Sequence, residues 1–148
     1  MTYPQPLAFM RHGETAWNAS KRYQGSTETE ISNQGQQQCL ENSKLLAGLF
    51  DQWGVGLEDV RLVTSPLQRA RQSAQIIASE LGVNSNAIEI ENAFREIAMG
   101  RWQGFNSAQV KDRFHLERKS RKFNRWEFAP QGGESLAGRA AELQRGDV

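Results

Sequence analysis

The sequence has very little cysteine or histidine and no long apolar run. One cysteine, Cys39, among 148 residues excludes an internal disulfide. No apolar run approaches the roughly 20 residues that a membrane span needs, and the N-terminus lacks the pattern of a signal peptide. We therefore expect a cytoplasmic protein without a membrane partner. The two histidines, His12 and His115, have no supporting cluster at ligand spacing. We expect no metal and no cofactor.

The composition is that of an ordinary globular protein. Charged residues make up 24% and apolar residues 38% of the chain, and the formal net charge is +1. These values exclude a disordered chain and a generally basic nucleic-acid-binding protein. The length suits one domain with its own core, and no repeat or linker interrupts it. We expect residues 1–148 to form a single domain.

Short apolar runs alternate with helical patterns along the chain. The expected strands cover residues 7–10, 61–64 and 87–90. The expected helices cover residues 33–50, 65–81, 106–120 and 134–145. Ser65-Pro66 reads as an N-cap followed by proline at the first helical position. This alternation predicts the α/β class, with a mostly parallel central sheet flanked by helices.

Arginines and a histidine fall where strands end or helices begin, which is where open α/β sheets bind ligands. Arg11 and His12 end the first expected strand, and Arg69 lies in the first turn after Ser65-Pro66, beside free helix amides that favour an anion. Arg22 lies on the loop between them. Guanidinium groups bind phosphate through paired charge-assisted hydrogen bonds. We expect a phosphate site.

A histidine in such a cluster has the character of a nucleophile, because nearby positive charge disfavours its protonation. His12 would take a phosphoryl group, and Glu96 is the candidate acid for the leaving oxygen.

The chain resembles the histidine phosphatase superfamily, also called the phosphoglycerate-mutase-like family. The blocks that carry the resemblance run in order from residue 7 to about 140: RHGET at 11–15, Asn18, Gln24-Gly25, SPLQRARQSA at 65–74, Glu96 followed by MGRWQG, and GGES at 132–135.

The resemblance implies a role for each matching residue. His12 is the phosphate-accepting nucleophile, Arg11 and Arg69 hold the phosphate, and Glu96 donates the proton. Asn18, Arg22, Gln24 and Gly25 are the expected substrate-binding residues. The short MGRWQG form resembles the phosphatase branch. We therefore expect hydrolysis of a small phosphorylated metabolite, with a phosphoglycerate mutase as the alternative.

The sequence departs from the family pattern in one respect. The family has a second pocket histidine, in a His-Gly step downstream of the GGES block. His115 precedes that block and is expected on a helix surface. Our hypothesis is a shortened family member, incomplete at the C-terminus and lacking its last strand and helix. A non-catalytic phosphate-binding protein is therefore a further alternative, and the exposed sheet edge predicts a homodimer.

Residues 111–125 hold seven Lys or Arg against two acids. A solvated helix face is the favoured interpretation over nucleic-acid binding, because no such motif accompanies the charge. A third interpretation is that this positive charge steers a phosphorylated substrate towards the pocket. Trp17 and Trp102 are candidates for a substrate wall or for core packing.

Overall fold

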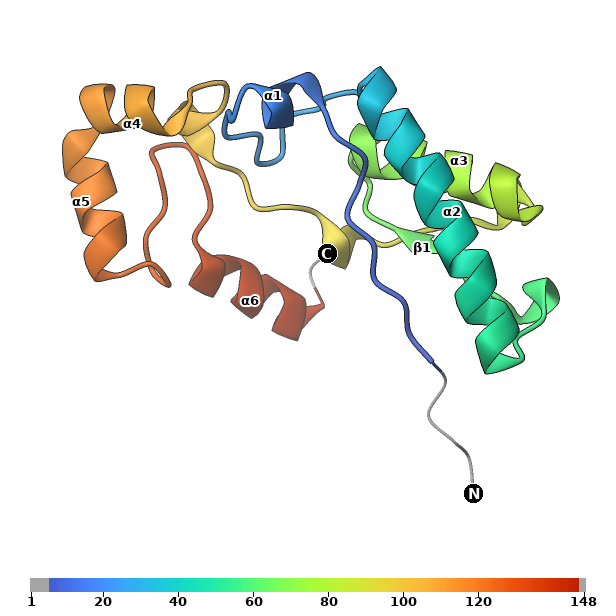
Figure 1. Ribbon diagram of the computed structural model, residues 1–148. Helices are drawn as coiled ribbons and strands as arrows, with labels where there is room; N and C mark the ends of the chain where they lie inside the picture. The colour runs from blue at the N-terminus through green and yellow to red at the C-terminus, as the bar shows by residue number, and fades with distance from the viewer. Residues whose placement is uncertain (1–5, 147–148) are drawn as a thin grey trace.

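The computed structural model describes residues 6–146. The α-helices are α1 (Ala16–Ala19), α2 (Asn33–Trp53), α3 (Gln68–Leu81), α4 (Ser107–Arg113), α5 (His115–Phe123) and α6 (Leu136–Arg145). The strands are β1 (Val63–Thr64) and β2 (Glu89–Ile90), and single 3-10 turns cover Leu57–Asp59, Ser85–Ala87, Asn92–Phe94 and Gly100–Trp102. Figure 1 shows α2 and α3 on one side of the molecule and α4 and α5 on the other. No helix in this described range is long and apolar enough to cross a membrane.

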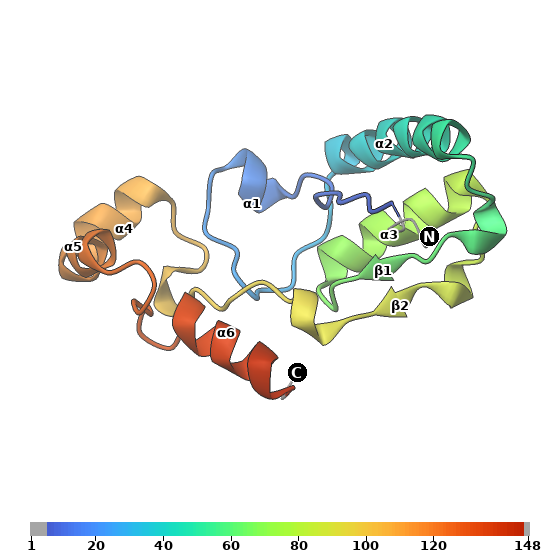
Figure 2. The same ribbon diagram turned by 90° about the horizontal axis from the view of Figure 1, so that it is seen from below.

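The two strands pair in parallel, with Val63 beside Glu89 and Thr64 beside Ile90. They are joined by α3, which packs on β1, and α2 packs on α3 (Figure 2). This is the strand–helix–strand unit that the alternating pattern predicts, and it confirms the α/β class. The sheet between residues 6 and 146 is smaller than expected, because it contains only these two strands.

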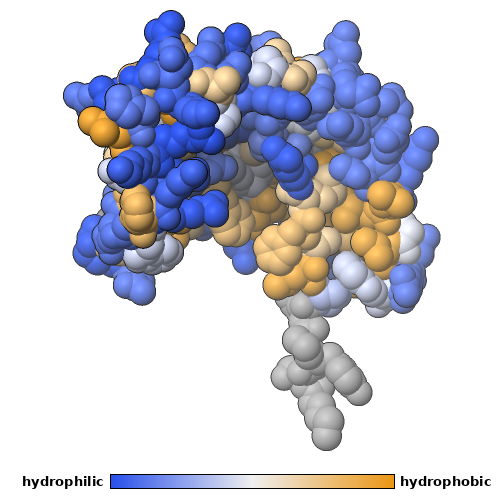
Figure 3. Space-filling view, turned by 60° about the vertical axis from the view of Figure 1, so that its left-hand side comes forward, coloured by the Kyte–Doolittle hydropathy of each residue, from blue (hydrophilic) through white to orange (hydrophobic). Residues whose placement is uncertain are grey.

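The predicted strand at residues 7–10 is wrong. These residues have no strand assignment, and Leu7 and Phe9 are 76% and 86% exposed. A strand forms only where a neighbour completes its hydrogen bonds, and no neighbouring strand pairs with this segment in the described structure. Figure 3 shows apolar surface gathered where the described chain meets the grey N-terminal residues.

Three of the predicted helices begin at side-chain caps, whereas two predicted helices differ from the structure. Ser32, Asn106 and Ser135 cap α2, α4 and α6 through their side chains. Helix α3 begins at Gln68 rather than at Pro66, and its N-cap, Leu67, makes no side-chain cap bond. Arg69 still lies in its first turn. The predicted helix at 106–120 is interrupted at Phe114, which ends α4 and precedes α5.

Two separate apolar clusters stabilise the fold. The first cluster joins α2 and α3 through Ile31, Cys39, Leu46 and Ile77. The second cluster is centred on Trp102, which is fully buried and packs with Met99 and Val110; partly buried side chains surround these residues. Trp102 is therefore a core residue, as one of the two interpretations predicted. The candidate site lies between these clusters.

Candidate active site

Two hydrogen bonds fix the protonation state of His12. The Nε–H of Arg69 donates to Nε2 of His12 across 3.2 Å. Because arginine has no acceptor, Nε2 of His12 carries no proton and presents a lone pair. The hydrogen therefore resides on Nδ1, which donates to the carbonyl oxygen of Gly13 at 2.8 Å. The imidazole is neutral, with its unprotonated nitrogen directed at Arg69.

The surroundings of His12 keep the ring neutral. Burial is the largest influence and lowers the pKa of His12 from its ordinary value of 6.5; the positive charges of Arg69 and Arg11 lower it further. The bond to the Gly13 carbonyl and the charge of Glu96 act in the opposite direction. Positive charge has the effect expected from the sequence, but burial contributes more to the lowered pKa.

Arg69 is held in place by backbone carbonyls of the loop that follows α1. Its Nη1 donates to Thr27 at 2.9 Å and its Nη2 donates to Gly25 at 2.8 Å, and the residue is only 2% exposed. Burial lowers the pKa of Arg69, opposed by the charges of Glu96 and Glu28. The guanidinium retains further N–H groups for an anion, because each Nη has made only one bond.

A second connection links α3 to the segment that carries His12. The backbone N–H of Gly13 donates to Oγ of Ser73 at 2.9 Å, and this hydroxyl donates to the carbonyl of Arg69 at 2.7 Å. Gly13 also lies against Gly35 of α2, where a Cβ on Gly13 would lie 2.5 Å from the Gly35 carbonyl oxygen. The glycine after His12 therefore permits a close approach between the loop and α2.

Gly25 links the loop that holds Arg69 to the segment that carries Glu96. It has φ of +53°, and a Cβ there would lie 2.6 Å from the backbone nitrogen of Met99 and 3.0 Å from the carbonyl oxygen of Ile97. Only glycine fits this approach without strain. The same residue provides the carbonyl that holds Arg69.

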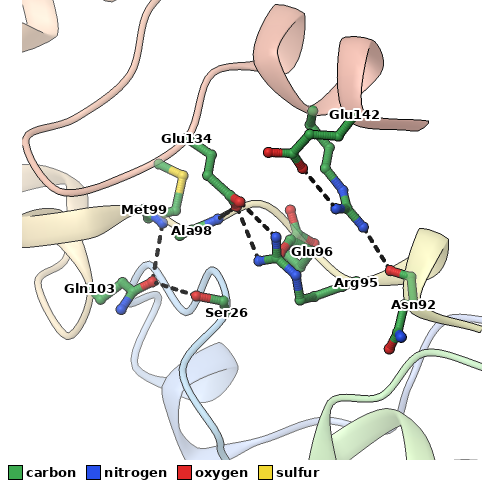
Figure 4. A network of polar contacts seen from close by, with 10 residues as sticks. Ser26, Asn92, Arg95, Glu96, Ala98, Met99, Gln103, Glu134 and Glu142 are labelled. Carbon is green, nitrogen blue, oxygen red and sulfur yellow. Dashed lines mark hydrogen bonds and ion pairs between the residues drawn. The ribbon is translucent and has the colours of Figure 1, made fainter. Parts of the chain in front are cut away.

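Glu96 is positioned by a network that includes the GGES block (Figure 4). The carboxylate of Glu134 accepts hydrogen bonds at 3.1 and 2.6 Å from Arg95, and one from the backbone N–H of Ala98 at 2.6 Å. The bond from the Arg95 guanidinium lowers the pKa of Glu134 and so keeps the carboxylate charged. Residues on both sides of Glu96 are thus tied to one carboxylate.

The predicted residues converge on one cavity of about 430 Å³. Of the eight predicted site residues, seven line it: Arg11, His12, Arg22, Gln24, Gly25, Arg69 and Glu96. Gln24 is buried and accepts hydrogen bonds from Thr15 and Thr29, and an Nη1–H of Arg22 donates to the Gly104 carbonyl. Asn18 is not among the lining residues. Its side chain instead forms a capping box with Thr15 at the start of α1.

Sequence reasoning missed part of the cavity wall. Arg121, Arg125, Phe128 and Glu134 also line it. The sequence shows that residues 111–125 are basic, and steering of a phosphorylated substrate was one interpretation of that charge. It does not show which of these side chains face the cavity. His115 is exposed on α5, as predicted, and does not line the cavity.

The sequence profile of the histidine phosphatase superfamily (branch 1) matches residues 7–145. The chain belongs to this superfamily. Its relatives in the histidine phosphatase superfamily include glucosyl-3-phosphoglycerate phosphatase from Mycolicibacterium vanbaalenii, 32% identical over 130 residues, covering 87% of this chain and 52% of the relative. A second is 2,3-bisphosphoglycerate-dependent phosphoglycerate mutase from Azorhizobium caulinodans, 26% identical, covering 93% of this chain and 64% of the relative.

Solved structures in the histidine phosphatase superfamily show the same fold. A mycobacterial glucosyl-3-phosphoglycerate phosphatase aligns with a TM-score of 0.72 at 28% identity, covering 90% of this chain and 58% of that structure. The α-ribazole phosphatase from Shigella flexneri, at 22% identity, aligns with a TM-score of 0.72 over 92% of this chain and 62% of its own. The chain spans about half the length of the curated glucosyl-3-phosphoglycerate phosphatases it matches.

Proposed function

We propose that the chain hydrolyses phosphomonoesters of small metabolites through a phosphohistidine on His12. The observation that carries the proposal is the tautomer of His12, whose unprotonated Nε2 lies 3.2 Å from Nε of the phosphate-binding candidate Arg69. A neutral imidazole with an available lone pair is the form that attacks phosphorus. Membership of the superfamily and relatives named as phosphatases support the same reaction.

The first half-reaction follows from this geometry. A bound phosphomonoester takes over the N–H groups of Arg69, so the Arg69–His12 bond is exchanged for bonds to phosphate oxygens. The Nε2 lone pair attacks phosphorus and the ester P–O bond breaks. The carboxyl group of Glu96 gives its proton to the leaving oxygen. The Gly13 carbonyl, which already accepts from Nδ1, stabilises the positive charge that develops on the ring.

The second half-reaction returns the site to its starting state. Water attacks the phosphoryl group and gives a proton to the Glu96 carboxylate. The P–N bond breaks, its electron pair returns to Nε2, and inorganic phosphate leaves. Arg11 and Arg69 offset the negative charge on phosphate oxygens in both steps.

Hydrolysis of an aryl phosphate tests the proposal. We expect the wild-type chain to release the phenol, His12→Ala to fall to the background rate, and His115→Ala to remain active, since His115 is exposed and outside the cavity. Protein quenched in alkali during turnover should carry an acid-labile phosphoryl group, which is absent from His12→Ala. Equal rates for the wild-type chain and His12→Ala would contradict the proposal.

A non-catalytic phosphate-binding role is the second candidate. It is favoured by one observation: within residues 6–146, His12 is the only histidine that lines the cavity. On this alternative, the chain binds inorganic phosphate but the wild-type and His12→Ala rates are the same. Transfer between 3- and 2-phosphoglycerate distinguishes the mutase alternative, because a hydrolase releases inorganic phosphate instead.

A further inference from the structure

Helix α5 (His115–Phe123) and the turn after it present an outward surface that the proposed hydrolysis does not use. Figure 1 places this helix at the outer edge of the molecule, on the side opposite α2 and α3. Its inward side is fixed by core contacts. Glu117 accepts a 2.7 Å bond from Nε1 of the buried Trp102, and the guanidinium of Arg121 lies 5.9 Å from the centre of the same ring. The residues on the opposite side of α5 therefore face solvent.

Large apolar side chains are exposed on this outward surface. Leu116 and Phe123 are seven residues apart, which is two helical turns, so they share one side of α5. They are 68% and 81% exposed, and Trp126, in the turn after the helix, is 54% exposed. The backbone carbonyl of Trp126 accepts a 3.0 Å bond from the N–H of Ala137, which ties this turn to α6. Single exposed apolar residues are ordinary, but three in one short helix and its following turn indicate a contact surface.

Positive charge accompanies these apolar side chains. Lys119 lies between Leu116 and Phe123 on the same side of the helix, and Lys122 directly precedes Phe123; both lysines are exposed. Neither lysine takes part in an ion pair within residues 6–146. The acid of α5, Glu117, bonds inward to the core. The outward surface of this helix is therefore both apolar and cationic.

This combination fits the surface of an anionic lipid bilayer. Basic side chains are attracted to anionic headgroups, while Leu, Phe and Trp side chains enter the boundary between headgroups and acyl chains. Residues 111–127 hold seven Lys or Arg against three acids, so attraction to an anionic surface exceeds repulsion from Asp112 and Glu127. Nucleic acid would account for the charge and for stacking on Phe123, but it offers no apolar interior for Leu116.

We propose that the outward surface of α5 and the turn after it binds anionic lipid bilayers reversibly. Leu116, Phe123 and Trp126 enter the headgroup boundary. Lys119 and Lys122 lie against the anionic headgroups. The expectation of no membrane partner came from the lack of a spanning run, and binding at the bilayer surface needs no such run. A short helix attaches weakly, so both the apolar and the charged contacts are required.

Co-sedimentation with vesicles tests the lipid preference. The wild-type chain is mixed with vesicles of phosphatidylcholine alone, or of equal parts phosphatidylcholine and phosphatidylserine. We expect binding to the mixed vesicles to be about tenfold tighter or more, because each Lys or Arg near an anionic surface contributes severalfold. His12→Ala should bind as the wild-type chain does, so the result is independent of the proposed hydrolysis.

The apolar contribution is measured with the variant Leu116→Ser/Phe123→Ser. Binding of this pair to the mixed vesicles should weaken about tenfold or more, because two large apolar side chains no longer leave water. Leu45→Ser/Leu57→Ser is the matched control and should bind normally. Its side chains are 67% and 43% exposed, but they lie in α2 and in the 3-10 turn that follows it. All four positions are exposed, so we expect these variants to fold.

The charged contribution is measured with Lys119→Gln/Lys122→Gln. We expect about tenfold weaker binding to the mixed vesicles, since two cations are lost from the contact surface. Lys44→Gln/Arg71→Gln removes the same charge from exposed positions of α2 and α3 and should bind normally. This control separates a contact at α5 from attraction by the net charge of the chain.

Penetration into the bilayer is measured by fluorescence quenching with lipids brominated on their acyl chains. We expect these lipids to quench part of the tryptophan emission of the wild-type chain, and Trp126→Phe to remove that quenching. Trp53→Phe, at a position of α2 that is 37% exposed, should retain it.

Several results would overturn the inference: no binding to the mixed vesicles, equal binding to phosphatidylcholine alone, wild-type binding by the Leu116/Phe123 pair, or quenching that persists in Trp126→Phe. Single-stranded RNA provides the comparison with another polyanion. Tighter binding of RNA than of the mixed vesicles, weakened by the lysine pair and unaffected by the apolar pair, would assign this surface to nucleic acid instead.

Discussion

The Nε–H of Arg69, in α3, donates to Nε2 of His12 across 3.2 Å. Nε2 is therefore the imidazole nitrogen that carries the lone pair. The other nitrogen donates to the carbonyl of the next residue, Gly13. Only the bond from Arg69 requires a neutral ring, because the bond to the Gly13 carbonyl also forms when the ring is protonated. Protonation at Nε2 would place a hydrogen against a donor that cannot accept it.

This relationship predicts how folding stability depends on pH. The pKa of His12 is lowered in the folded state, whereas in the unfolded chain it is near 6.5. The unfolded state therefore binds more protons, and the contribution to stability is present above pH 6.5 and is lost as the pH falls through the folded pKa. We expect the melting temperature of the wild-type chain to fall more between pH 7 and pH 5 than that of His12→Gln. Because His115 is present in both proteins, parallel curves would contradict the prediction.

Gly25→Ala should destabilise the fold more than the same substitution at a glycine that also has a positive φ but has no atoms close to the added Cβ. The left-handed conformation costs a non-glycine residue about 1–2 kcal/mol, and the new Cβ would also meet Met99 at 2.6 Å. Gly54→Ala is the matched control, because Gly54 has φ of +65° at the end of α2 and a Cβ there would have no atom within 4 Å. Urea unfolding measures both free energies, and equal losses would show that the close approach to Met99 costs nothing.

Glu134→Gln should lower the rate of phosphoryl transfer while leaving the binding of inorganic phosphate nearly unchanged. The substitution retains an oxygen for the N–H of Ala98 but loses the two charged bonds from Arg95, and so loosens the segment that carries Glu96. We expect a severalfold fall in kcat with KM little altered, and a changed pH profile. Glu127→Gln, at an exposed position, is the control. A loss confined to KM would assign Glu134 to binding instead of positioning.

Inorganic phosphate should stabilise the wild-type chain against heat. A ligand at tenfold its dissociation constant adds about 1.4 kcal/mol to the free energy of unfolding, which raises the melting temperature by roughly 3–6 °C in a domain of this size. Arg69→Met should abolish the rise. Arg71→Met, at an exposed position of the same helix, should keep it. The scans are made at constant ionic strength, and an equal rise in the two variants would place the phosphate elsewhere.

Local signals in the sequence predicted the positions of α2 and α6, but they missed α1, the later start of α3 and the break at Phe114. Much of the site was predicted from the family resemblance. The side chains of Ser32, Asn106 and Ser135 each accept a hydrogen bond from the backbone N–H three residues later. Such short-range bonds can be predicted from the sequence. The motif residues meet in one cavity because the segment that carries His12, the first turn of α3 and the segment after β2 converge there. Their catalytic roles stay predictions.

Features that depend on distant partners were not predictable. Residues 7–10 have the composition of a buried strand, but a strand also needs a neighbour, and the composition of Leu7 and Phe9 does not reveal whether one is present. The face of α5 that meets the cavity is fixed by the bond between Glu117 and Trp102, which are 15 residues apart in sequence. Arg121 and Arg125 could therefore be counted as basic residues but not assigned to the site.

The position of the cavity between two apolar clusters has a consequence for cooperativity. Arg69 belongs to the helix that packs on the first cluster, and Met99 belongs to the second. Separate clusters of this kind can open as separate units in native-state hydrogen exchange. A phosphorylated ligand that contacts residues from both clusters would couple their opening. The slowly exchanging amides of α2 and of α4 would then show the same opening free energy when the cavity is filled, and different values when it is empty.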